Sequence, residues 1–126
     1  MKGGYVDGFV LPVPKNKTAA YKKMAALGAK TWMKCGALAY YECMGDDLKV
    51  KSEHGFKPRA FPDIAKAKAN ETVWFSFIMF KDKKHRNAVN KKVMAAMAKE
   101  AKAWGMPMPF EPNRMAYGGF KVIVSR

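Results

Sequence analysis

The sequence predicts a single α+β domain in which an antiparallel sheet is covered by two helices. A chain of 126 residues has the length of one domain. Its apolar pattern changes between periods of two and of about 3.6 residues, in the order strand, helix, strand, strand, helix, strand. Residues 72–80, Thr-Val-Trp-Phe-Ser-Phe-Ile-Met-Phe, are apolar on both alternating sides, which is typical of a central strand covered on both faces.

The first strand is predicted over residues 5–11 and should end at Pro12 and Pro14, because proline cannot donate to a central ladder. Its two sides carry Val6, Gly8 and Val10 on one face and Tyr5, Asp7, Phe9 and Leu11 on the other. We expect the small side chains to face the helices, since they allow close approach. The first helix should begin at Asn16 as its N-cap and run to Cys35, before Gly36.

The second strand is predicted over residues 37–47, with Ala37 and Ala39 toward the helices and Glu42 on the opposite face. Residues 48–71 form a long polar connection, in which residues 61–68 are predicted to be a short extended piece. His54 lies in this connection and is predicted to face solvent.

After the 72–80 strand, Asp82 should cap a second helix over residues 83–97, extending to Trp104 if Gly105 ends it. His85 and Arg86 fall in its first turn, where cations oppose the helix dipole and so favour an acidic neighbour. A proline-rich loop over residues 106–113 leads to the last strand, residues 114–124. Its glycine pair, residues 118–119, predicts a bulge or a close approach of another backbone.

This order of elements is the ferredoxin-like βαββαβ pattern over residues 1–126, with both helices on one face and the strands ordered fourth, first, third, second. The face away from the predicted helices would expose large side chains, namely Tyr5, Phe9, Leu11, Tyr40, Met44, Trp74, Ile78 and Phe80. Leaving them in water forgoes on the order of 10 kcal/mol of burial. We therefore predict a two-fold homodimer packed sheet to sheet, which forms a dimeric α/β-barrel.

The net charge of +14 arises mainly from lysine, because only four of the 24 basic residues are arginine. Lysine-rich surfaces attract polyanions loosely, so weak nonspecific nucleic acid binding is one hypothesis and a merely solvated surface is its alternative. Cys35 and Cys43 lack metal-ligand spacing and are predicted to be reduced thiols. The sequence shows no secretory signal and no membrane-spanning run, and we predict a cytoplasmic protein.

With this strand order, Tyr117, Asp7, Ser76 and Glu42 are predicted to form one row across the sheet and to be the candidate catalytic residues. The candidate ligand-binding residues around this row are Tyr5, Phe9, Tyr40, Trp74 and Arg114. Burial raises the pKa of a carboxyl group, so an acid in such a cavity is a candidate general acid or base. The alternative is structural: the acids bond Arg114, His85 or backbone groups and fix the strand register. We predict no cofactor and no metal, because neither His54 nor His85 lies on the cavity face. We do not expect Ser76 to act as a nucleophile, because it has no obvious histidine partner.

Short motifs along nearly the whole chain resemble one bacterial family. They are Tyr5-Val6-Asp7-Gly8-Phe9-Val10, Gly36-Ala37-Leu38, Glu42-Cys43 with Asp46-Asp47, Phe61-Pro62, Glu71-Thr72-Val73 with Phe75-Ser76, His85-Arg86, Val89-Asn90 with Lys92-Val93-Met94, Met108-Pro109-Phe110, and Arg114-Met115 with Tyr117-Gly118-Gly119-Phe120. The family is the YbaA-like family, domain of unknown function 1428. The resemblance implies a dimeric α/β-barrel, in a superfamily with cofactor-free monooxygenases, haem-dependent enzymes and small sensor proteins. It implies no established activity. The chain departs from the family pattern after Met94 and in its lysine content.

Three functional hypotheses follow. The first is a small-molecule pocket, between sheet and helices or at the dimer interface, serving an oxygenase-like or isomerase-like enzyme without a cofactor. The second is a ligand-binding or sensor protein that uses the same pocket without turnover. The third is a basic protein that binds polyanions such as RNA through its lysines.

Overall fold

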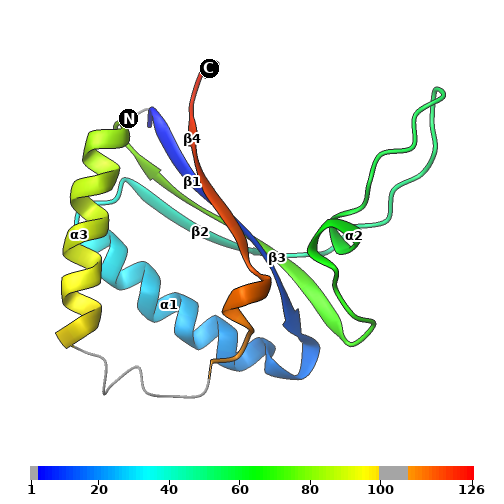
Figure 1. Cartoon of the computed structure of the whole chain (residues 1–126), viewed down its shortest axis with the longest axis horizontal. Coiled ribbons are helices and arrows are strands. Elements are labelled where there is room, and N and C mark those ends of the chain that lie inside the picture. Colours follow the sequence, from blue (N-terminus) through cyan, green and yellow to red (C-terminus); the bar gives the residue numbers. More distant parts are fainter. Residues whose placement is uncertain (1–2, 100–107) are drawn as a thin grey trace.

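The structure, a computed structural model, describes residues 3–99 and 108–126 (Figure 1). Its elements in chain order are β1 (Tyr5–Pro14), α1 (Thr18–Lys34), β2 (Ala39–Met44), α2 (Phe61–Ala65), β3 (Glu71–Phe80), α3 (Lys83–Lys99) and β4 (Ala116–Lys121), with 3₁₀ turns at Lys15–Lys17 and Pro112–Arg114. The strands form one antiparallel sheet in the order β2-β3-β1-β4. The predicted α+β class is confirmed.

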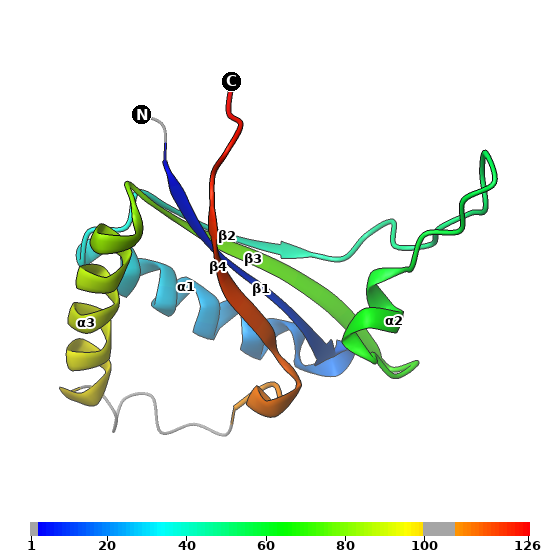
Figure 2. The ribbon, with the colours of Figure 1, turned by 45° about the horizontal axis from the view of Figure 1, so that its top comes forward.

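Helices α1 and α3 lie on the same side of the sheet, as the two views show (Figures 1 and 2). The face beneath them, here called the covered face, contributes the buried residues Tyr5, Asp7, Leu11, Val13, Trp74, Ser76, Ile78 and Phe80. The apolar residues of this set pack against Tyr21 and Ala25 of α1 and against Val89 and Val93 of α3.

The prediction of which face the helices cover was therefore wrong. The large side chains of β1, with Trp74, Ile78 and Phe80 of β3, fill the space between sheet and helices. The small set of β1 that includes Gly8 lies on the other side. The reason is volume: a close-packed core needs bulky side chains to fill the space between a sheet and a helix layer. The opposite side, here called the open face, carries Val6, Gly8, Val10, Ala39, Tyr41, Cys43, Phe75, Phe77, Met79, Gly118 and Phe120.

Strand β1 runs through Pro12 and Pro14 rather than ending before them. Its pairing with β4 stops at Val10 and Ala116, whereas its pairing with β3 continues to Pro14 and Glu71. Both prolines therefore lie where β1 is an edge on one side, and an edge tolerates a missing N–H.

The structure has the predicted N-cap at the start of α3 but not at the start of α1. The predicted cap of α3 is confirmed, because Asp82 Oδ1 accepts a hydrogen bond of 2.7 Å from the backbone N–H of His85. Asn16 does not cap α1, since it lies inside the 3₁₀ turn and Lys17 precedes the helix without a side-chain hydrogen bond. Predictions for Trp104, Gly105 and the start of the proline loop lie outside the described residues.

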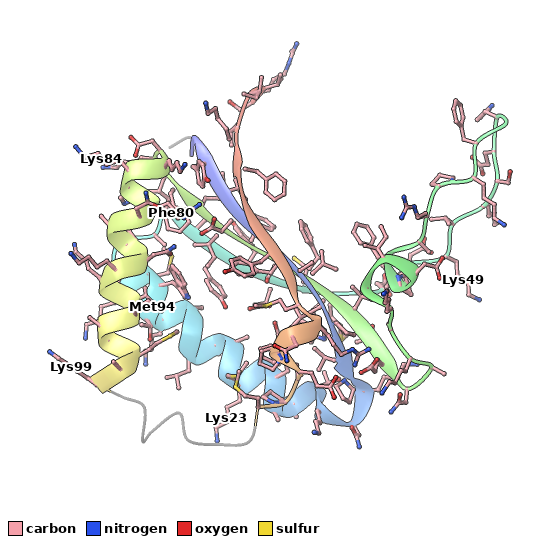
Figure 3. The ribbon with its side chains drawn as sticks, viewed as in Figure 1. Lys23, Lys49, Phe80, Lys84, Met94 and Lys99 are labelled. Atoms are coloured by element: carbon pink, nitrogen blue, oxygen red, sulfur yellow. The ribbon has the colours of Figure 1, made fainter. Side chains whose placement is uncertain are left out.

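The connection between β2 and β3 holds the largest departure from the predicted elements. Residues 61–65 form the helix α2 instead of an extended piece, with Pro62 in the first turn, where proline is well tolerated. Lys66 ends the helix with a left-handed φ of 53°. Residues 46–60, here called the arm, project well away from the rest of the chain (Figures 1 and 3).

Candidate ligand-binding site

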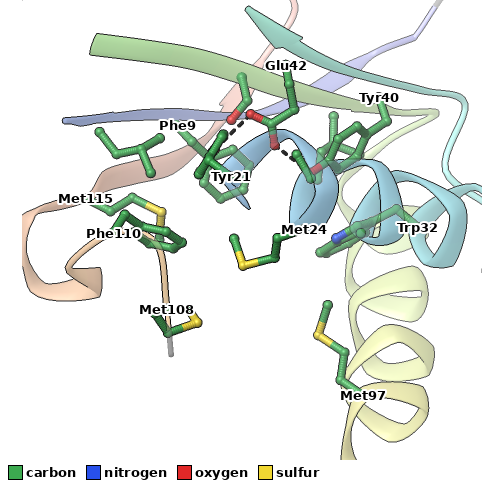
Figure 4. A pocket seen from close by; sticks show the side chains of 15 residues that line it. Phe9, Tyr21, Met24, Trp32, Tyr40, Glu42, Met97, Met108, Phe110 and Met115 are labelled. Carbon is green, nitrogen blue, oxygen red and sulfur yellow. Dashed lines mark hydrogen bonds between the residues drawn. The ribbon is translucent and has the colours of Figure 1, made fainter. Parts of the chain in front are cut away.

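A cavity of about 300 Å³ lies between the covered face and the helices (Figure 4). Its wall comes from β1, β2 and β3 on the sheet side, from α1 and the end of α3, and from the segment that leads to β4. The lining residues are Phe9, Leu11, Tyr21, Met24, Ala25, Gly28, Trp32, Tyr40, Glu42, Ser76, Ile78, Met97, Met108, Phe110 and Met115. A concave, mostly apolar space with a few convergent polar groups is typical of a small-molecule site.

The polar groups gather around Glu42. Its Oε1 accepts a hydrogen bond of 2.9 Å from the hydroxyl of Tyr21, and its Oε2 accepts one of 2.7 Å from the hydroxyl of Tyr40 (Figure 4). Burial, and then the neighbouring Glu42 carboxylate, raises the pKa of both tyrosines far above the ordinary value of 10.0. Both phenols are therefore neutral donors at any physiological pH.

This arrangement leaves Glu42 able to accept more. Each carboxylate oxygen has two lone pairs, and the tyrosines use one on each oxygen. The two hydroxyls hold the carboxylate in place, so its remaining lone pairs can accept a hydrogen bond from a donor group of a bound molecule. Ser76, paired with Glu42 across β2 and β3, adds a buried hydroxyl to the same wall.

The remaining wall is rich in methionine. Met24, Met97, Met108 and Met115 all line the cavity, together with aromatic rings such as Phe110. Unbranched thioether side chains adapt to irregular shapes and make favourable contacts with aromatic rings. The cavity can therefore adjust to its contents without losing its apolar character.

The predicted row of polar residues is shifted by one pair. The observed row runs Glu42, Ser76, Phe9 and Tyr117, so that Phe9 stands where Asp7 was expected. Asp7 belongs to the next row on the same face, opposite Ile78 and Gly119. The alternation of side chains along a strand determines the face of the sheet on which a residue lies. The pairing register determines which residues of the neighbouring strands lie beside it.

Asp7 is occupied by a structural contact outside the cavity. Arg86, in the first turn of α3, places its Nε 3.3 Å from Asp7 Oδ1, an ion-pair distance without hydrogen-bond alignment. The same guanidinium donates a 2.8 Å hydrogen bond to the hydroxyl of Tyr5 and lies 5.0 Å from the centre of its ring. Burial raises the pKa of Asp7, and the charge of Arg86 opposes that rise. The acidic neighbour expected for this helix start is thus Asp7.

The other predicted site residues are spread around the sheet. Tyr117 is 72% exposed and stacks on Phe9 with ring centres 5.7 Å apart. Trp74 packs on Tyr21 at 4.6 Å, and its buried Nε1 has no hydrogen-bond partner among the described residues. Of the nine residues proposed from the sequence, the structure brings Phe9, Tyr40, Glu42 and Ser76 together in the cavity wall.

Arg114 lies apart from the cavity. It makes two hydrogen bonds to Glu71, of 2.6 and 2.7 Å, and a third of 3.3 Å to Glu111. This bidentate pairing lowers the pKa of Glu71 from 4.5 to about 2. The predicted ligand-binding role of Arg114 has no support in this placement.

Sequence reasoning missed the helix side of the cavity. Tyr21, Met24 and Trp32 recur at helical spacing within the predicted first helix, and such a pattern indicates a core-facing side without any sign of a cavity. Tyr21 is the important omission, since its hydroxyl completes the Glu42 cluster across 21 residues of chain. A tyrosine in an otherwise apolar stripe is the available signal, because a buried hydroxyl requires a partner.

The described ranges contain no cluster of three or more His, Cys, Asp or Glu residues that could hold a metal ion. Within the same part of the chain, no helix has the length and hydropathy needed to cross a membrane.

The fold and the cavity together define a small α+β protein with a methionine-rich cavity and one carboxylate clasped by two tyrosines. The chain belongs to the family described as "Protein of unknown function (DUF1428)", whose model matches residues 4–112. It is 41% identical over 120 residues to "Uncharacterized protein YbaA" of Escherichia coli K12, covering 95% of this chain and 97% of that protein, and equally similar to YbaA of Shigella flexneri. The resemblance to this family is thereby confirmed.

Among solved structures, the chain is similar to a hydantoinase/carbamoylase family amidase from Burkholderia ambifaria. The TM-score is 0.32 at 14% identity, and the match covers 99% of this chain and 29% of that structure. The chain thus spans less than a third of the amidase.

Proposed function

We propose that this protein binds a small, largely apolar molecule that carries one hydrogen-bond donor or positive group, which it presents to Glu42. The observation that carries this proposal is the Glu42 cluster: one carboxylate, held by Tyr21 and Tyr40, forms part of the wall of an otherwise apolar cavity. Among the lining residues that the structure describes, Glu42 carries the sole carboxyl group.

Benzylamine, benzyl alcohol and benzoate test this proposal, because they share a ring and differ in the group offered to Glu42. We expect ligand-observed NMR or calorimetry to rank their affinities in that order. Glu42→Gln should remove the preference for the amine, since the charge is gone while the side-chain shape remains. Asp7→Asn is the matched control: it removes a carboxylate from the same face outside the cavity and should leave the ranking unchanged. Equal affinities for all three probes in the unmodified protein would contradict the proposal.

Turnover in the same cavity, as an oxygenase-like or isomerase-like enzyme without a cofactor, is the second candidate. It is supported by the placement of Glu42 and Ser76 against an apolar cavity, where an acid meets a bound molecule with little water. Native mass spectrometry of freshly purified protein should reveal a retained molecule. Its mass and chromatographic retention before and after incubation in air then separate binding from oxygenation or isomerisation.

We further propose that the ferredoxin-like subunit forms a homodimer through the open face, completing a dimeric α/β-barrel. Tyr41, Phe75 and Phe120 are 53%, 46% and 64% exposed there. Phe77 stacks on Tyr41 with ring centres 4.9 Å apart and lies tilted beside Phe75 at 5.7 Å. A contiguous aromatic surface of this kind is rarely left in water. The apolar face that needs a cover is therefore the open face, which is the opposite side of the sheet from the one expected from the sequence.

Light scattering across a dilution series tests the dimer. Phe75→Asp should raise the dissociation constant by at least tenfold, because it places a charge in the apolar contact. Met33→Asp is the matched control, since Met33 is 45% exposed but lies on α1. A monomer at every accessible concentration would contradict the dimer.

The lysines of the helix layer support a weaker proposal, the loose binding of polyanions such as RNA. Helices α1 and α3 contain nine lysines and no acidic residue, and none of the ion pairs within the described ranges uses a lysine. Retention of a single-stranded oligonucleotide at low salt should fall steeply as salt rises. The triple change Lys23→Gln, Lys30→Gln and Lys34→Gln on α1 should weaken it more than the equal charge loss from Lys49→Gln, Lys51→Gln and Lys57→Gln on the arm.

A further inference from the structure

The arm ends in a well-defined hairpin turn. Glu53 and Phe56 exchange both backbone hydrogen bonds, at 2.9 and 2.8 Å. Between them, His54 and Gly55 have φ values of 52° and 78°. Two successive residues with positive φ make the two-residue turn that best suits a β-hairpin. The tip is therefore shaped by its own backbone.

Within residues 3–99 and 108–126, no other element buries the outer part of the arm. Every residue from 49 to 59 is exposed, and the apolar side chains of Val50 and Phe56 are 45% and 71% exposed. A lone two-stranded hairpin is at best marginally stable in water, and the left-handed His54 adds a cost. An aromatic residue at the tip of a hairpin that projects from its own domain becomes buried only when it contacts another molecule.

A small apolar hollow lies at the root of the arm, at the edge of the open face. It has a volume of about 210 Å³ and is lined by Cys43, Met44, Gly45, Asp46, Leu48, Phe61, Val73 and Phe75. Phe61 of α2 and Phe75 of β3 are half exposed around it. A single aromatic ring is a fitting occupant of such a hollow, because it brings a large apolar surface with little conformational entropy.

We propose that Phe56 at the tip of one arm fills the hollow at the root of the arm in a second copy of this chain. This inference rests on the homodimer proposed above and names a contact that the dimer would use. Seven residues between root and tip reach roughly 23 Å at about 3.3 Å per residue. In a two-fold dimer, two such arms lie side by side in opposite directions, so each tip reaches the other root and the contact is closed and isologous.

The charges along the arm favour this antiparallel placement. Lys51 and Lys57 flank the tip beside one acid, Glu53, whereas Asp46 and Asp47 are exposed at the root beside one base, Lys49. When the tip of one arm lies over the root of the other arm, opposite charges come together. Tip against tip would bring the lysines of both copies together, which costs free energy. A polyanion would also be attracted to the lysines but would leave the apolar hollow empty.

A disulfide cross-link tests the contact directly, because the hollow already contains the exposed, free thiol of Cys43. In a Cys35→Ser background, Phe56→Cys should form a disulfide with Cys43 of the partner under mild oxidation. The product should run on a non-reducing gel at twice the 14.1 kDa chain mass. Adding Cys43→Ser should abolish it. Val124→Cys, an exposed position far along the chain, controls for random collision and should not cross-link.

A second measurement keeps the test independent of thiol reactivity. Phe56→Ala should raise the dimer dissociation constant at least tenfold, and the fold should persist because Phe56 makes no contact within its own core. The arm proposal fails, with the dimer intact, if the protein is dimeric but the cross-link is missing, persists with Cys43→Ser, or has the mass of one chain. If the unmodified protein is monomeric throughout, the proposed dimer itself fails.

Discussion

Both faces of the sheet carry large apolar side chains, but those of one face are buried and many of those on the other are exposed. On the covered face, Leu11, Ile78 and Phe80 are at most 2% exposed, and the acids Asp7 and Glu42 each have assigned partners. On the open face, Phe77 packs against Tyr41 and Phe75, and those two rings remain about half exposed. Apolar alternation on β3 therefore marks both faces, and the difference in volume lies on β1, whose larger set of side chains faces the helices.

The largest expected difference between the faces concerns single aromatic side chains. Phe80→Ala should lower the free energy of unfolding by about 3–5 kcal/mol, because it leaves a cavity under α3. Phe120→Ala should change it by no more than about 0.5 kcal/mol in dilute, monomeric protein, since that ring is 64% exposed. Urea titration of both variants measures the difference. A large cost for Phe120→Ala at high dilution would mean that the subunit itself covers the open face.

A second contrast uses adjacent glycines of β4 that point to opposite faces. A Cβ at Gly119 would collide with the Tyr5 hydroxyl and the Arg86 guanidinium, whereas one at Gly118 would meet no described atom within 4 Å. We expect Gly119→Ala to cost about 1–3 kcal/mol in thermal or urea unfolding, as overpacking does. Gly118→Ala should be nearly neutral in the monomer. Equal effects would show that the Tyr5–Arg86 contact yields easily.

These glycines also show what the sequence could and could not predict. The pair predicted a close approach, which is found at Gly119, but the approaching atoms are side chains and the strand has no bulge. Periodicity identified the main strands and helices, because burial repeats with the geometry of each element. It could not supply the register that puts Phe9 beside Ser76. It also could not supply the contact between Tyr21 and Glu42, which are 21 residues apart in sequence, since both features depend on how distant elements dock. The five-residue α2 was missed because a single turn has too few residues to show a period.

Two neighbouring tyrosines of β2 extend the comparison to hydrogen bonds. Tyr40 points to the covered face and donates to Glu42, while Tyr41 points to the open face and is 53% exposed. Tyr40→Phe should lower the free energy of unfolding by about 1.5–3 kcal/mol, because a part-buried carboxylate loses a donor. Tyr41→Phe should have almost no effect on the monomer. The two variants should also differ in ligand binding: Tyr40→Phe should alter the affinity for benzylamine, whereas Tyr41→Phe should not.

The smallest expected difference in stability at neutral pH, which grows in acid, is between variants of two carboxylates, Glu71 and Asp7. The pKa of Glu71 is held at about 2 by Arg114, below its ordinary 4.5, so Glu71 contributes stability above pH 4.5 that is lost as the pH falls toward 2. The pKa of Asp7 is raised by burial, so its contribution has the opposite sign and is lost as the pH rises above 3.8. Urea titrations between pH 2 and 6 should therefore show a weaker loss of stability in acid for Glu71→Gln and a steeper loss for Asp7→Asn. If both variants changed the slope in the same direction, the Arg86 charge would have to outweigh burial at Asp7, and the covered face would hold its acid as an ordinary ion pair.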